Sequence, residues 1–171
     1  MQTLLTQSFQ TTIEQIADNY QYGYFITFVK KQYSHHIITK QEVIKKIKNI
    51  MNNDDIEFHI FKVVNVGDSV HFNTIHYHCV VFSNKQTFIN AIILNRISKI
   101  SETTINIKTI FNVTGALGYI RDKHNILKIY TNNQLLKSDI RKVGQKIETQ
   151  ITLYFLSITL KIIRGRHYTP T

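Results

Sequence analysis

Alternating apolar and polar residues predict strands at four places in the chain. The runs 25–29, 56–66, 75–82 and 104–111 are rich in β-branched and aromatic residues. Such residues suit a pleated, half-buried surface, and an apolar residue at every second position is typical of a strand. A fifth apolar run at 126–130 fits either a short strand or the continuation of the helix before it.

Apolar residues at intervals of three and four predict helices around these strands. The second helix has the clearest start, because Thr39 is a good N-cap and Glu42, three residues later, completes a capping box. The polar run 52–55 ends that helix. For the first helix, an ordered N-terminal arm is the alternative. The predicted helices cover residues 4–16, 39–50, 85–97 and 116–122.

The order strand, helix, strand, strand, helix, strand predicts an α+β protein with the split βαβ, ferredoxin-like plan. In that plan helices cover one face of an antiparallel sheet, and the other face can stay open for a ligand. At 171 residues the chain is long enough for one well-buried domain, so we expect residues 1–171 to form a single domain. Residues 131–171 read as a C-terminal appendage whose role the pattern leaves open.

Net charge adds an expected partner to this picture. The chain carries 21 Lys and Arg against 11 Asp and Glu, a formal charge of +10. An excess of this kind favours a polyanion such as nucleic acid, because neutralising phosphates releases counterions. Its one cysteine, Cys79, excludes an internal disulfide framework. We expect an intracellular protein without a membrane partner, since no apolar run approaches the ~18 residues of a span and no signal peptide is evident.

The first candidate chemistry is a histidine pair, His76-Tyr77-His78, within a predicted strand. Side chains two apart on a strand point to the same face, so the two imidazoles project together. Neutral imidazole is the commonest nitrogen ligand of metals, and the pair therefore forms half of a possible metal site. The alternative is two hydrogen-bonded or exposed histidines on a sheet.

An acidic residue would complete such a site. Asp68 lies eight residues before His76, near the end of the adjacent strand, and Glu57 and His71 compete with it for the same role. Two imidazoles and a carboxylate suit Mg²⁺ or Mn²⁺, and would also accept Zn²⁺ or Ni²⁺.

The second candidate pair is Tyr119 and Lys123, which share a face if the segment 116–122 and its end are helical. Tyrosine is a poor nucleophile at its ordinary pKa of ~10, so it needs a metal-polarised electrophile and cationic neighbours. Lys123 would stabilise phosphate charge. The alternatives are a half-buried helix tyrosine and a solvated lysine.

Taken in order, these motifs resemble the HUH endonuclease domain of rolling-circle replication initiator (Rep) proteins, of the single-tyrosine class. Such proteins come from plasmids and small circular single-stranded DNA viruses. The segment 25–28 (Phe-Ile-Thr-Phe) looks like the first motif, His76-Tyr77-His78 like the second, and Tyr119 with Lys123 like the third. The resemblance covers roughly residues 20–130. The chain departs from many viral members in spacing tyrosine and lysine four apart, and in offering Asp68 where glutamate is usual.

The resemblance implies a mechanism and its parts. His76, His78 and Asp68 (or Glu57) would hold Mg²⁺ or Mn²⁺ against a phosphate of single-stranded DNA at an origin stem-loop. Tyr119 would attack that phosphate, leaving a 3′-hydroxyl and a 5′-phosphotyrosine link that the reverse reaction rejoins.

Further contacts and partners follow from the same resemblance. No GxxxxGK[ST] motif occurs, so helicase activity would come from another protein, while self-association remains open. The cytoplasm, or a host nucleus or organelle, would be the location. Tyr22, Tyr24 or Tyr33 would stack on bases. The expected DNA-backbone contacts are Lys30, Lys31, Lys45, Lys46, Lys48 and Arg121.

Two other readings fit parts of the pattern. A non-enzymatic, RRM-like nucleic-acid binder would share the strand order and the charge without needing a metal, although the aromatic-rich glycine motif of RRMs is absent. A transposase or relaxase of the same HUH superfamily would use the same residues on a different DNA substrate.

Overall fold

The structure is a computed structural model that describes residues 5–30, 37–52, 54–65, 75–87, 103–142, 145 and 152. The chain divides into two compact units, Met1–Lys137 and Ser138–Thr171. All the strands and helices named below belong to the first unit. The expected single domain with an appendage from residue 131 stays a prediction.

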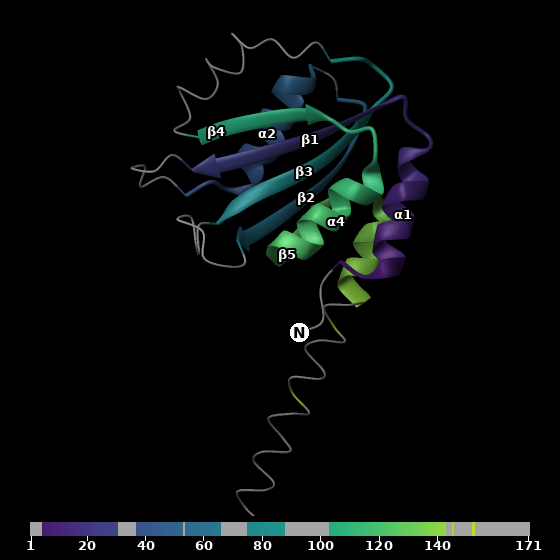
Figure 1. Ribbon diagram of the computed structural model, residues 1–171, viewed down its shortest axis with the longest axis vertical. Helices are drawn as coiled ribbons and strands as arrows, with labels where there is room; N and C mark the ends of the chain where they lie inside the picture. Colours follow the sequence, from purple (N-terminus) through teal and green to yellow (C-terminus); the bar gives the residue numbers. More distant parts are fainter. Residues whose placement is uncertain are drawn as a thin grey trace, which may run out of the picture. The chain divides into compact units, whose positions relative to one another are not determined.

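A five-stranded antiparallel sheet forms the centre of the first unit, with the strand order β4-β1-β3-β2-β5 (Figure 1). Its first four strands have the order of the split βαβ plan, so the predicted α+β class is confirmed. The ambiguous run 126–130 belongs to a strand, not to a helix. The strands are β1 (Tyr22–Lys30), β2 (Ile56–Asn65), β3 (His76–Ser83), β4 (Thr103–Thr109) and β5 (His124–Thr131).

Helix α2 (Lys40–Met51) packs on one face of the sheet, as the split βαβ plan requires. The predicted capping box is present, since the side chains of Thr39 and Glu42 each accept a hydrogen bond from the other's backbone N–H. Asn52, with φ of 46°, ends the helix in the left-handed conformation that asparagine tolerates. In the core on this face, Val43 and Ile47 of α2 pack with side chains at alternate positions of the strands. These strand residues are Ile26, Phe28, Ile60, Tyr77 and Cys79.

Helices α1 (Gln7–Ala17) and α4 (Val113–Lys123) lie side by side on the opposite side of the sheet from α2 (Figure 1). Thr114 Oγ1 donates a hydrogen bond to Glu14 Oε1 at 2.7 Å and ties the two helices together. They bury a second apolar layer, which includes Phe9, Ile13, Leu117 and Ile120. The side chains of β3 that face this layer are the ones at even-numbered positions, His76 and His78 among them.

The predicted helix boundaries hold approximately where the structure describes them. The helix expected at 116–122 begins three residues earlier, because Asn112 is its N-cap and accepts a hydrogen bond from Gly115 N–H. The helix expected at 85–97 lies almost entirely outside the described residues. None of the helices in the described segments has the length and apolar character needed to cross a bilayer.

Candidate metal and nucleophile site

His76 and His78 project from β3 toward the same side of the sheet, as their spacing predicts. On the neighbouring strand β2, His76 pairs with Val63 and His78 pairs with Phe61. Tyr77 points the other way, and its hydroxyl donates a hydrogen bond to the Ile38 carbonyl in the core beneath α2. Both imidazoles are almost fully buried.

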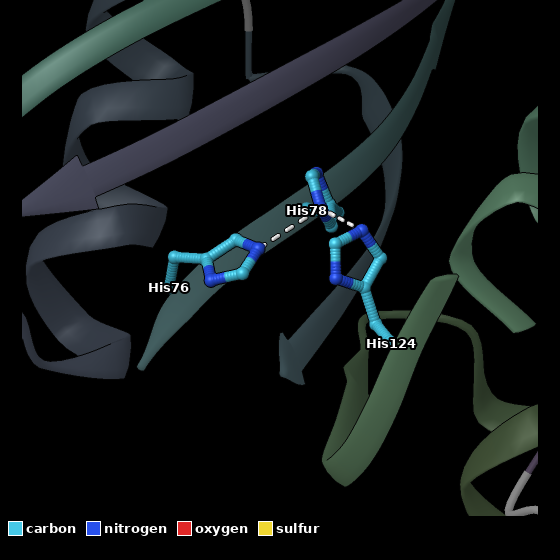
Figure 2. Close-up of side chains that lie close together, drawn as sticks. All are labelled: His76, His78 and His124. Carbon is cyan, nitrogen blue, oxygen red and sulfur yellow. Dashed lines mark hydrogen bonds between the residues drawn. The ribbon is translucent and has the colours of Figure 1, made fainter. Parts of the chain in front are cut away.

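A third imidazole, that of His124, completes a cluster (Figure 2). His78 Nε2 lies 3.2 Å from His76 Nε2 and 3.0 Å from His124 Nε2. The cluster is buried, since His124 is 7% exposed, and the three candidate ligand atoms all lie within 4.8 Å of one another.

The junction between α4 and β5 places His124 there. The helix ends at Lys123, and His124 is at once its C-cap and the first residue of β5, with extended φ and ψ of −139° and 146°. No linker separates the two elements. A side chain at the start of β5 is therefore held within about one helical turn of Tyr119, which α4 carries.

The donor set fits a metal ion. A neutral imidazole nitrogen either donates one hydrogen bond or offers one lone pair, so His78 Nε2 cannot form two good hydrogen bonds to two other Nε2 atoms. A cation between the three uses all three lone pairs. Ligands bound at about 2.1 Å and separated by 90–110° lie roughly 3.0–3.4 Å apart, which matches the His76–His78 and His78–His124 separations. His76, His78 and His124 can thus hold a metal ion, which the sequence predicted for the first two.

Burial favours the neutral, metal-binding form of two of these imidazoles, those of His78 and His124. It lowers the pKa of His78 to about 2, with smaller contributions from His76 and His124. The pKa of His124 falls to about 4, again chiefly through burial and then through His76. A ligand that is already neutral needs no deprotonation when a cation arrives.

Thr27 fixes the orientation of the central imidazole. It is the cross-strand partner of His78 on β1, and its Oγ1 lies 3.0 Å from His78 Nδ1. When Nδ1 carries the proton, it donates to Thr27 Oγ1 and leaves the Nε2 lone pair facing the cluster. Second partners of this kind set the tautomer of metal-binding histidines.

Tyr119 stands beside the cluster. Its ring centroid lies 5.2 Å from that of His124, 5.7 Å from that of His78 and 6.1 Å from that of Phe25. The residue is 48% exposed, whereas the histidines are buried. The structure therefore joins the predicted nucleophile to the predicted ligands and leaves it open to a substrate.

The side chains of the two basic residues of α4, Arg121 and Lys123, lie on different faces of the helix. Lys123 is exposed and one turn beyond Tyr119, on the same helix face. Arg121 instead binds Asp122, with Nε–Oδ1 of 2.7 Å, and reaches Gln10 Oε1 of α1 at 3.4 Å. Arg121 is thus held toward α1, and the DNA contact expected of it stays a prediction.

Of the acidic ligands considered, only Glu57 lies in the described part of the chain, and it is not at the cluster. Asp68 and the competing His71 lie outside the described residues. Glu57 is buried at the other end of β2, 3.8 Å from His59 Nε2, and four residues from Phe61, which faces His78. Four strand residues span roughly 13 Å, so Glu57 does not reach the site. The third ligand that the structure supplies is His124, which the sequence reasoning missed.

Most of the lysines expected to bind DNA lie across the sheet from the site. Lys45, Lys46 and Lys48 belong to α2, on the opposite face from the histidines. Lys46 is also buried, its Nζ donating to Thr103 Oγ1, and Lys48 pairs with Asp54 at 2.8 Å. These three lysines are therefore not placed beside Tyr119, and the DNA contacts expected of them stay predictions.

The remaining DNA-contact candidates are also limited by the fold. Lys30 shares the side of β1 that carries Phe28, which faces α2. Tyr24 is 3% exposed and cannot stack on a base. Lys31 and Tyr33 lie outside the described residues.

Comparison of the chain with protein-family models, with curated proteins and with solved structures finds no match.

Proposed function

We propose that this protein is a metal-dependent endonuclease that cuts and rejoins single-stranded DNA through Tyr119, in the manner of a rolling-circle replication initiator. One observation carries the proposal: a half-exposed tyrosine lies beside three buried histidines whose Nε2 atoms converge. A tyrosine needs a polarised electrophile to act as a nucleophile, and a metal held by those histidines would supply it.

In this reaction the phosphate of a DNA phosphodiester exchanges its ester bond to the 3′-oxygen for an ester bond to the tyrosine. Tyr119 Oη attacks the phosphorus, a bond from Oη to phosphorus forms, and the bond from phosphorus to the 3′-oxygen breaks. The proton lost by the phenol equals the proton gained by the departing 3′-hydroxyl. The product is a 5′-phosphotyrosine, and attack by a 3′-hydroxyl reverses the step. A metal bound by His76, His78 and His124 would stabilise negative charge on the phosphate oxygens, and exposed Lys123 would add a second positive charge.

The ligand set narrows the choice of metal. Mg²⁺ prefers oxygen ligands and keeps much of its water, whereas imidazole suits later transition metals. The three imidazoles that the described residues supply therefore favour Mn²⁺ over Mg²⁺ as the working ion. Zn²⁺ and Ni²⁺ would bind the same three nitrogens.

The test is covalent capture of DNA. The full chain is incubated with Mn²⁺ and a pool of labelled single-stranded oligonucleotides that carry a randomised window beside a stem-loop. We expect a labelled protein band that survives detergent and boiling, and expect Tyr119→Phe to abolish it. Tyr130→Phe is the matched control, because Tyr130 lies on β5 near Lys40 and Lys128, away from the cluster. Equal capture by wild type and Tyr119→Phe would exclude Tyr119 as the nucleophile.

Nucleic-acid binding without catalysis is the second candidate, favoured by the net charge of +10 and the split βαβ sheet. Such a protein would bind single-stranded DNA equally well in EDTA and would cleave none of the pool. Metal-dependent covalent capture would exclude it.

A further inference from the structure

Next to Tyr119 the sheet has an open groove of about 600 Å³. Helices α1 and α4 lie over the β2 and β5 side of this face, and none of the described helices lies over the outer part of β1 and β4 (Figure 1). A groove of this size falls within the range of small-ligand sites. Its lining includes Phe25, Thr27, Asn106, Lys108, Phe111 and Tyr119.

The floor of the groove is set by the β1–β4 register. Thr27 pairs with Asn106, and Phe25 pairs with Lys108, so these side chains project to the same side as His78. The intervening residue Ile107 turns toward α2 and packs against the core. Strand β4 thus presents a polar edge to the groove, with an amide and an ammonium two residues apart.

Aromatic surface bounds the same space. Phe111 is 96% exposed, an extreme value for a phenylalanine, and it lies two residues after the end of β4. Phe25 stacks on the His78 ring, with centroids 5.1 Å apart, and also lines the groove. Proteins bind unpaired nucleotides with exposed aromatic faces, on which bases stack, and with nearby amide and ammonium groups.

The groove is continuous with the reaction site. Tyr119 and His78 belong to its wall, and Thr27 in its floor contacts His78 Nδ1. Asn106 is two strands away from His78, or about 10 Å at a strand spacing of ~4.8 Å. A ligand in the groove would therefore lie beside a phosphate held between Tyr119 and the histidines.

We propose that this groove is a specificity subsite for one unpaired nucleotide next to the bond that Tyr119 attacks. The position of this subsite relative to the cleaved bond rests on the proposed function. The binding of a nucleotide in the groove does not depend on it. Asn106 reads the base edge, since its amide offers a donor and an acceptor side by side. Phe111 supplies the stacking surface, and Lys108 neutralises one phosphate.

The test measures binding without catalysis. The full chain in EDTA is titrated into fluorescent single-stranded oligo-dA, oligo-dC and oligo-dT of about 12 nucleotides, and anisotropy gives a Kd for each. We expect unequal Kd values for wild type. In Asn106→Ala the ratio between the best and worst oligonucleotide should fall by about fivefold or more. Phe111→Ala should weaken binding of all three by about tenfold.

Salt dependence tests the lysine separately. The slope of log Kd against log salt should fall by about 0.7 in Lys108→Gln, the value for one phosphate contact on a single strand. Lys128→Gln is the matched control, because Lys128 is exposed on β5, on the same side of that strand as Tyr130, which packs against the core beneath α2. Its slope should equal that of wild type. Since Asn106, Lys108 and Phe111 are all exposed, the variants should keep the wild-type melting temperature, which is measured alongside.

Three results would overturn the subsite. They are equal Kd values for the three oligonucleotides in wild type, wild-type discrimination in Asn106→Ala together with wild-type affinity in Phe111→Ala, or no binding of single-stranded DNA. The proposed function fails by a different result, the absence of Tyr119-dependent cleavage, which EDTA binding does not measure. A groove that discriminates bases in a protein that never cleaves would support the subsite and exclude the endonuclease.

Discussion

At the scale of single residues, His78 is the centre of the site. Its Nε2 faces two other imidazoles and its Nδ1 faces Thr27, so its tautomer is fixed from one side and its lone pair directed to the other. Burial of the ring removes water as a competing partner for either nitrogen. Small changes at Thr27 or His124 should therefore have large effects on metal binding.

Replacing Thr27 by valine should weaken metal binding about 10- to 100-fold, the usual cost of removing an outer partner of a histidine ligand. Valine keeps the shape of threonine and removes only the oxygen that faces His78 Nδ1. Thr27→Ser keeps the oxygen and should bind metal as wild type does. Competition between the protein and a chromophoric chelator for Zn²⁺ measures this affinity. If valine and serine bind alike, Thr27 does not orient the ligand.

Replacing His124 by asparagine should reduce Zn²⁺ affinity by at least as much, because one of three ligands is lost. Asparagine occupies part of the same buried space and remains polar. The matched control is Glu57→Gln, since Glu57 is equally buried on the same sheet face but lies far from the cluster. Calorimetric titration of both variants distinguishes the ligand of the structure from the one expected from the sequence. A greater loss in Glu57→Gln would reverse the assignment.

The sequence predicted His76 and His78 as ligands but not His124, because only the first two are related by local spacing. The pair was visible because a strand repeats every two residues, which is local information. His124 reaches the cluster only because β5 pairs with β2 and α4 ends without a linker. The one local signal was a histidine directly after the helix that carries Tyr119, five residues beyond it.

At the scale of elements, β3, α4 and the start of β5 make the site, while α2 packs on the core at the other face of the sheet. Alternation and helical spacing predicted both helices and all the central strands. The same patterns did not predict which face of the sheet each helix covers, because α2 and α4 are both amphipathic. That is why Lys45, Lys46 and Lys48 were assigned to DNA although they lie across the sheet.

Substitutions at two helix N-caps can separate the contribution of α4 to the reaction from the contribution of α2 to stability. Asn112→Ala and Thr39→Ala each remove an N-cap acceptor, and each should lower the free energy of unfolding by about 1 kcal/mol. Only Asn112→Ala should also slow covalent capture of DNA, because α4 carries Tyr119 and α2 does not. Urea denaturation and the capture assay give the two quantities. Equal slowing in both variants would mean that capture reports general stability.

At the scale of the whole molecule, the sheet face that carries the site also holds a buried polar pair at its other end. His59 is fully buried, and its Nδ1 lies 3.0 Å from Thr131 Oγ1 and its Nε2 3.8 Å from Glu57 Oε1. Burial lowers the pKa of His59 to about 3 and raises that of Glu57. A neutral imidazole at this position makes the fold sensitive to acid, independently of the metal site.

The sign of that sensitivity follows from the two states of His59. In the unfolded chain it takes up a proton below its ordinary pKa of about 6.5, whereas in the folded protein it stays neutral until about 3. Between these values the unfolded state binds more protons, so stability falls as pH falls. Above about 6.5 both states are neutral, and His59 adds no pH dependence.

Replacing His59 by glutamine should flatten this dependence. Glutamine can still hydrogen-bond Thr131, but it does not titrate. From pH 6.5 to 5 the free energy of unfolding of wild type should fall more steeply than that of His59→Gln, by up to about 1.4 kcal/mol per pH unit. Urea denaturation in EDTA keeps metal out of the comparison. His78 and His124 titrate in the same direction but are present in both proteins, so the difference in slope belongs to His59, and parallel slopes would contradict its buried, neutral state.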